Sequence, residues 1–371
     1  MNATPELREA CPKHMEYGPC GGVDFDGSCE VGEFRCVFLD LPTVRWRGGG
    51  EGDDDRLARD APGATGAPTA PGSSGARAMR ALLATRQIVV ADFPGRALDL
   101  ASLEECADTL AGRVDAALAG DSGRSRVQFP PAYRAHLIQQ RRLAVWTGLN
   151  CRDRNRVALE SELAGLSEVG VAAVHCVTGD HTLTGDRPDA LPVFDLDSTR
   201  AAALARRAGH LVSVGESPTT PPHDRRAARL AEKVRAGADL CFVNHAGGAE
   251  PVRRFIAESW DAGAAPGFIA CVPMVVDHGS ATLLRSFTTL VLPEGYLDGI
   301  LAAADPRRAG IDAALALSEQ LLALDGVVGV NLSGGAADGK EREFAAALAE
   351  VADRLQLGRP DGRAASPKLT P

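Results

Sequence analysis

The first forty residues hold four cysteines whose spacing suits metal binding. Cys11, Cys20, Cys29 and Cys36 are separated by eight, eight and six residues, in a chain with nine cysteines among 371 residues. Thiolates that converge in a short, glycine-rich segment are typical ligands of zinc and of iron–sulfur clusters. We therefore predict a small cysteine-rich metal-binding domain over residues 1–47. A 4Fe–4S cluster and zinc both suit the pattern, and the sequence leaves the choice between them open.

A pair of disulfides is the alternative for these cysteines. Disulfides need an oxidising compartment, and the opening residues MNATPELREA have neither the basic nor the apolar region of a secretion signal. We therefore expect a cytoplasmic protein with reduced thiols. No apolar run approaches the roughly eighteen residues that cross a bilayer, so no membrane partner is expected. The formal net charge of -9 and the pI near 5.5 argue against nucleic acid.

A Gly-, Ala-, Pro- and Ser-rich stretch at residues 48–76 follows the cysteines and has no hydrophobic period. We predict a flexible linker over residues 48–80, a folded domain over 81–358 and a disordered tail over 359–371. A flexible coil of this length spans roughly 30 Å. The linker would therefore let the cysteine-rich domain reach the folded domain.

The folded domain alternates short apolar runs with alanine-rich amphipathic stretches, which is the pattern of repeated βα units. Strands are expected at residues 87–93, 114–119, 143–149, 172–178, 210–215, 239–244, 267–274 and 327–332. Helices are expected at residues 154–169, 198–208, 224–236, 251–262, 294–304, 308–324 and 341–355. Eight parallel strands favour a (β/α)8 TIM barrel over an open doubly wound sheet, and no GxGxxG motif follows a strand.

Polar residues follow nearly all of the expected strands. They include Asp92, Asn150, Asp180, Asn244 and Asn331. Any one of them could cap the next helix. A TIM barrel carries its chemistry at the carboxyl ends of its strands, so together these residues predict a polar ligand there.

Several motifs carry a resemblance to a known family. CPKHMEYGPCGG with the trailing CEVGEFRC resembles the cysteine-rich domain that accompanies many bacterial methylenetetrahydrofolate reductases, fused or as a separate subunit. The barrel resembles the catalytic part of the same family through NCRDRNRVALESELAGL, through VTGDH followed by PVFDLDS, and through EKVRAGAD. These matches span nearly the whole chain apart from the linker and the extreme C-terminus.

The resemblance implies a flavin, FAD or FMN, across the carboxyl ends of the barrel strands. The flavin would take hydride from NAD(P)H, or electrons from a donor protein, and reduce 5,10-methylenetetrahydrofolate to 5-methyltetrahydrofolate. By the same resemblance, Asp180 would be a catalytic residue beside the flavin ring. Thr178, Gly179 and His181 would shape the flavin pocket, and Lys233 would reach the phosphate or ribityl arm.

The resemblance also implies a folate site. Asp92 would be the catalytic acid that protonates a folate ring nitrogen, because the methylene bridge must open before hydride arrives. Asn150, Arg152, Asn244 and Asn331 would bind the folate.

This chain departs from the family at three places. Asp92 replaces the usual glutamate, and Val243-Asn244 replaces the usual threonine–glutamine pair. Arginines stand where the fifth barrel helix usually carries acidic and amide groups: Arg225, Arg226 and Arg229. They could hold a phosphate or a polyglutamate tail, or form a solvated helix face.

Three functions remain open at this stage. The first is a flavin-dependent folate reductase, and the second is a folate-dependent one-carbon transferase that needs no flavin. The third is a non-catalytic electron-relay or partner subunit, which the polar strand ends disfavour because a scaffold would not need them. A folate is the expected small-molecule partner, and the sequence leaves open whether the chain forms a homo-oligomer.

Overall fold

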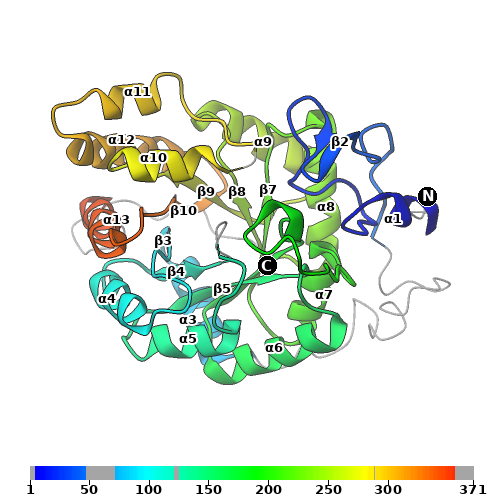
Figure 1. Cartoon of the computed structure of the whole chain (residues 1–371), viewed down its shortest axis with the longest axis horizontal. Coiled ribbons are helices and arrows are strands. Elements are labelled where there is room, and N and C mark those ends of the chain that lie inside the picture. The colour runs from blue at the N-terminus through cyan, green and yellow to red at the C-terminus, as the bar shows by residue number, and fades with distance from the viewer. Residues whose placement is uncertain (1–4, 47–71, 121–124, 288, 356–371) are drawn as a thin grey trace.

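A closed barrel of eight parallel strands forms the centre of the protein (Figure 1). The computed structural model describes residues 5–46, 72–120, 125–287 and 289–355. The barrel strands are β3 (Ile88–Asp92), β4 (Ala116–Ala119), β5 (Val145–Asn150), β6 (Ala173–Val177), β7 (Val212–Glu216), β8 (Leu240–Val243), β9 (Gly267–Pro273) and β10 (Val327–Ser333). They lie in sequence order, and β10 pairs with β3 to close the barrel. The predicted TIM barrel is confirmed.

Helices surround the barrel, as the βα pattern predicts. They are α4 (Leu100–Leu110), α5 (Pro131–Gln139), α6 (Arg156–Val169), α7 (Ser198–Arg207), α8 (Arg226–Ala236), α9 (Ala249–Asp261), α10 (His278–Arg285), α11 (Tyr296–Leu301), α12 (Pro306–Leu322) and α13 (Glu341–Leu355). Short 3-10 turns lie at η1 (Thr182–Thr184) and η2 (His223–Arg225). The main core lies between the strands and these helices. No helix in the described ranges combines the length and the hydrophobicity that a bilayer crossing needs.

Helix α3 (Ser74–Leu83) seals the end of the barrel where the strands begin. Its Ala76 and Met79 are buried in one cluster with residues at strand starts, such as Ile88 and Leu240. The predicted linker is therefore wrong for residues 74–80, because burial against the barrel stabilises a helix there. Residues 48–71 of the predicted linker and the predicted tail at 359–371 lie outside the described residues.

The cysteine-rich module (residues 5–46) has little regular structure, as expected for a domain built from loops. It contains α1 (Pro5–Ala10) and a small antiparallel hairpin of β1 (Ser28–Cys29) and β2 (Gly32–Arg35). Its small core joins Cys11, Met15 and Phe38 with the partly buried Cys20 and Cys36.

The module packs directly against the barrel beside α7 and α8 (Figure 1). Tyr17, Val44 and Trp46 form an apolar cluster with Ala236 of α8, and the rings of Tyr17 and Trp46 lie 5.1 Å apart. The backbone N–H of Trp46 donates to Glu232 of α8. The module is therefore a fixed part of the fold in this structure.

Candidate functional site

Asp92, at the carboxyl end of β3, is held by three hydrogen-bond donors from the end of β10. Its Oδ1 accepts from Asn331 Nδ2 at 2.9 Å, and its Oδ2 accepts from Ser333 Oγ at 2.9 Å and Gly334 N at 3.0 Å. Burial raises the pKa of Asp92, although the three donors act in the opposite direction. The predicted acid therefore has a fixed position and a pKa displaced towards the range where it can carry a proton.

Of the three donors, only Ser333 can also accept a proton from Asp92. Asn331 Nδ2 and the Gly334 amide can only donate, whereas a serine hydroxyl can turn and accept. A proton on Oδ2 would therefore be shared with Ser333 Oγ. The sequence placed Asp92 and Asn331 at neighbouring strand ends, and the structure joins them, but it gave no reason to single out Ser333.

Asn331 also carries a buried acceptor without a partner among the described residues, beside Asp92. Its side chain is 1% exposed, and its Oδ1 has no hydrogen-bond partner among the described residues. A buried polar atom without a partner costs free energy, which a ligand donor at this position would recover. Asp92 and Asn331 together thus offer neighbouring acceptor oxygens for a ligand with N–H groups.

The other predicted folate contacts lie apart from this pair. Asn244, after β8, is exposed and donates from Nδ2 to Ser217 Oγ at 2.9 Å. Asn150 is buried at the end of β5, and the buried Arg152 forms a two-point ion pair with Asp153 at 2.8 and 2.7 Å. Their roles in folate binding stay predictions.

The TGDH loop, residues 178–181, lies against the cysteine-rich module. Thr178 Oγ1 contacts Met15 Sδ at 3.6 Å, and the backbone N–H of His181 donates to Glu30 at 2.8 Å. Gly179 has a φ of 91°, which favours glycine at this turn. Asp180 keeps 56% of its side chain exposed and lies 3.5 Å from Arg126. Among these residues, Asp180 is therefore the most open to a ligand.

Lys233 of α8 lies in a buried ion pair inside the wall of the barrel. Its Nζ is 2.6 Å from Glu216 Oε1, at the end of β7, and donates to the Gly215 carbonyl at 2.7 Å. Burial lowers the pKa of Lys233, although Glu216 acts in the opposite direction. A flavin contact for this residue stays a prediction, but its ammonium is already paired with a carboxylate.

These contacts bear on whether a flavin fits the predicted pocket. Thr178, His181 and Lys233 each direct a polar group to the module or to the barrel, so none of these groups points to an open ligand position. A flavin on these three residues would have to share or displace these protein contacts. Asp180 alone would be a weak anchor for so large a group.

Two of the arginines of the fifth barrel helix bind the module. Arg225 donates to the carbonyls of Leu39 and Leu41, and Arg226 donates to the Cys20 carbonyl at 3.1 Å. Arg226 and Arg229 are 2% and 1% exposed, so neither belongs to a solvated helix face. Arg225 and Arg226 thus contact the module, whereas Arg229 donates to Thr199 Oγ1 at 2.7 Å and lies 3.6 Å from Asp197, both within the barrel domain.

Backbone groups contact each of the four thiols of the module. Cys20 Sγ accepts the Gly22 N–H at 3.3 Å. Burial raises the pKa of each of the other three thiols, and backbone groups act against it: those of Met15 and Lys13 at Cys11, Val31 at Cys29 and Phe38 at Cys36. Such N–H donors stabilise thiolates that bind a metal. The donor set therefore fits a thiolate-bound zinc or iron–sulfur centre.

Electrostatics also links these thiols. Burial, with a smaller contribution from the neighbouring Cys20, raises the pKa of Cys11 and of Cys36 to about 11. Among the described residues, however, no group of three or more His, Cys, Asp or Glu side chains is placed closely enough to hold a metal ion. A metal would have to draw the sulfurs together and deprotonate them. The metal site at the four cysteines stays a prediction.

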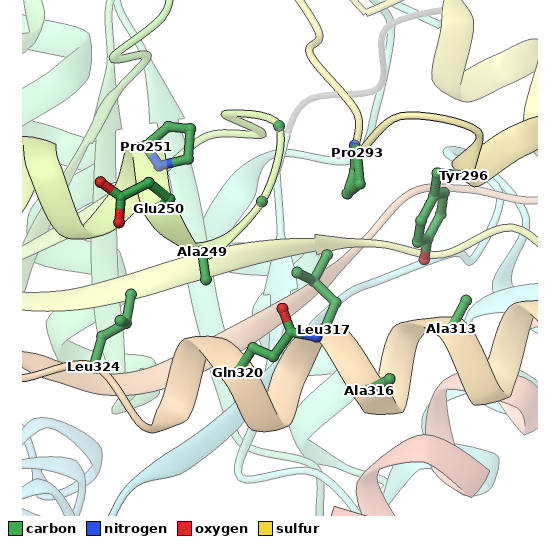
Figure 2. Close-up of a pocket in the computed structure, with 12 residues that line it drawn as sticks. Ala249, Glu250, Pro251, Pro293, Tyr296, Ala313, Ala316, Leu317, Gln320 and Leu324 are labelled. Carbon is green, nitrogen blue, oxygen red and sulfur yellow. The ribbon is translucent and has the colours of Figure 1, made fainter.

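A cavity of about 590 Å³ lies outside the barrel wall, among α9, α11 and α12 (Figure 2). Its walls are mostly apolar, with Pro251, Pro293 and Leu317 beside the polar Tyr296 and Gln320. None of the residues that line it is a predicted site residue. The candidate chemistry therefore belongs to the strand ends and to the module.

Fold and site together define a TIM barrel whose strand ends carry a half-buried acid and whose outer edge carries a module with four thiols. A family model described as "Methylene-tetrahydrofolate reductase C terminal" matches residues 7–45. The cysteine-rich module is therefore similar to this family, in agreement with the resemblance seen in its cysteine motif. No curated protein sequence matches the chain.

Solved structures support the barrel fold. An uncharacterized protein from Clostridium thermocellum, described as binding two copies of 5-methyl-5,6,7,8-tetrahydrofolic acid, has a TM-score of 0.55 at 11% identity over 75% of this chain and 99% of that chain. 2,3-dimethylmalate lyase, a PEP mutase/isocitrate lyase superfamily member, has a TM-score of 0.42 at 16% identity over 70% of this chain and 78% of that chain. Identities this low show the fold alone.

Proposed function

We propose that this protein is a folate-dependent enzyme of one-carbon metabolism that binds a reduced folate at the carboxyl ends of its barrel strands. The observation that carries the proposal is Asp92 with its partners Asn331 and Ser333. A pterin ring presents adjacent N–H groups along one edge, and the oxygens of Asp92 and Asn331 offer matching acceptors. The folate-binding neighbour with the same fold and the family of the module support this choice of ligand.

Asp92 would supply the proton that a one-carbon reaction needs. A carbon bound to a folate nitrogen leaves more readily when that nitrogen is protonated. Burial raises the pKa of Asp92, and the Ser333 hydroxyl can turn to hold the proton on Oδ2. The same step serves methyl transfer and the opening of a methylene bridge, so it does not depend on the electron source.

A flavin-independent one-carbon transferase suits the geometry best. Three predicted flavin contacts are already committed to protein partners, whereas the Asp92 cluster keeps an acceptor without a partner among the described residues. The flavin-dependent reductase is the second candidate, favoured by the family description of the module and by the exposed carboxylate of Asp180.

Calorimetry with 5-methyltetrahydrofolate tests the proposal on protein purified without oxygen. We expect binding, and we expect Asp92→Asn to weaken it by about 10- to 100-fold, because a ligand group left without its buried partner costs about 1–3 kcal/mol. Asp325→Asn is a matched control, since Asp325 is exposed before the start of β10. Failure to bind any reduced folate would refute the proposal.

A visible spectrum of the same sample separates the two candidates. A colourless protein that binds folate supports the transferase. Flavin absorption that bleaches when methyltetrahydrofolate is added would establish the reductase instead. A broad iron–sulfur absorption would assign a cluster to the module under either function.

A further inference from the structure

Glu30 lies at the point where the cysteine-rich module meets the TGDH loop. Its Oε1 is 2.5 Å from Lys13 Nζ within the module and accepts the His181 amide of the barrel at 2.8 Å. The side chains of Lys13 and Glu30 are 3% and 5% exposed. Water therefore cannot replace either contact cheaply.

The module is shaped to bring Glu30 to this place. The Glu30 amide donates to the Gly22 carbonyl at 3.0 Å, and a Cβ at Gly22 would overlap the Glu30 carboxylate. A side chain at residue 22 would therefore push the carboxylate away from its partners. A glycine at this position therefore leaves the space that the Glu30 side chain occupies.

The barrel side of the contact is the start of a short ordered loop. His181 is the residue before η1, its Nδ1 accepts the Leu183 amide at 3.2 Å, and its ring stacks on Phe194 at 5.8 Å. A second module contact, from Met15 to Thr178, holds the other end of the TGDH motif. The exposed Asp180 lies between these two fixed points.

We infer that Glu30 is a positioning residue for the barrel site: it fixes the loop at residues 178–184 and so sets where Asp180 meets a ligand. This role rests on the proposed function, in which a reduced folate binds at the carboxyl ends of the barrel strands, because Asp180 follows the end of β6 at that edge. Glu30 itself does not touch the ligand. Lys13 serves to hold the Glu30 carboxylate in place and to balance its buried charge.

Hydrogen exchange measured by mass spectrometry on the ligand-free full chain tests the role of Glu30. We expect Glu30→Ala to raise the exchange rate of peptides that contain His181 by tenfold or more, because the amide loses its acceptor and the loop can open. Glu33→Gln is the matched control, because Glu33 is an exposed glutamate of the same module. It should leave the exchange of the loop unchanged.

A second variant keeps the test decisive if Glu30→Ala unfolds the module, which loss of protection across β1 and β2 would reveal. Glu30→Gln keeps one acceptor oxygen but loses the charge that pairs with Lys13, so we expect a smaller rise at the same peptides. Unchanged exchange at residues 178–184 in the folded variants would overturn the inference.

Folate binding separates this inference from the proposed function. If Glu30 positions the loop, Glu30→Ala should weaken 5-methyltetrahydrofolate binding by about tenfold, with Glu33→Gln equal to the wild type. A wild-type protein that binds no folate but shows the exchange change would refute the function and keep the positioning role of Glu30. Normal folate affinity in a variant with a freed loop would overturn the link between loop and ligand.

Discussion

Replacing Lys233 by methionine tests whether this lysine serves the fold or a cofactor. The change removes a cation from a buried pair and leaves the Glu216 carboxylate, 3% exposed, with Arg226 at 3.8 Å as its remaining cationic partner. Breaking a buried ion pair by removing one partner costs about 3–5 kcal/mol. Each kcal/mol shifts the Tm of a domain of 150–250 residues by about 2–4 °C, so we expect a fall on the order of 10 °C.

Calorimetric unfolding of the single and double variants measures this effect. The double variant Lys233→Met with Glu216→Leu removes both charges, and we expect it to recover most of the lost stability. A Lys233→Met protein with an unchanged Tm that has lost a bound flavin would refute the structural role. A double variant as unstable as the single one would show that the unpaired Glu216 carboxylate does not cause the loss of stability.

Three further predictions address the acid, the thiols and the domain interface. Because burial raises the pKa of Asp92, the native state binds this proton more tightly than the unfolded chain, so wild-type stability falls as pH rises through the native pKa. Asp92→Asn should lack this part of the pH dependence in denaturant titrations while losing about 100-fold or more in turnover. Cys20→Ser should abolish metal content by elemental analysis and also raise hydrogen exchange at residues 178–184, whereas an undisturbed loop would contradict a rigid link to the module. Trp46→Ala should lower the free energy of unfolding by about 3 kcal/mol, because it leaves a cavity beside Tyr17 and Ala236. Limited proteolysis of this variant should then cleave the module before the barrel.

The barrel could be predicted from the sequence because its strands are local signals. Each buried parallel strand is a short apolar run, and the eight runs match β3 to β10 with differences of a few residues at their ends. Helix α3 was missed for the opposite reason. Residues 74–80 are rich in small residues and resemble a linker, and only contact with the floor of the barrel makes Ala76 and Met79 part of a core.

The candidate site was likewise predictable only where local sequence patterns place its residues. Asp92 and Asn331 could be predicted together because the carboxyl ends of parallel strands converge in a barrel. The contact between Glu30 and His181 joins residues 151 positions apart, and no local pattern announces it. Glu216 ends β7, and its pairing with Lys233 depends on how α8 packs against that strand.

The docked position of the module has a consequence for the order of events during synthesis. Tyr17, Val44 and Trp46 leave the ribosome about 190 residues before α8, which completes the surface that covers them. At about 5–20 residues per second, this interval lasts roughly 10–40 s. During that time a metal bound to the four thiols would fold the nascent module before α8, which the module contacts, has been synthesised. Metal supply in the cell would then govern the yield of folded protein.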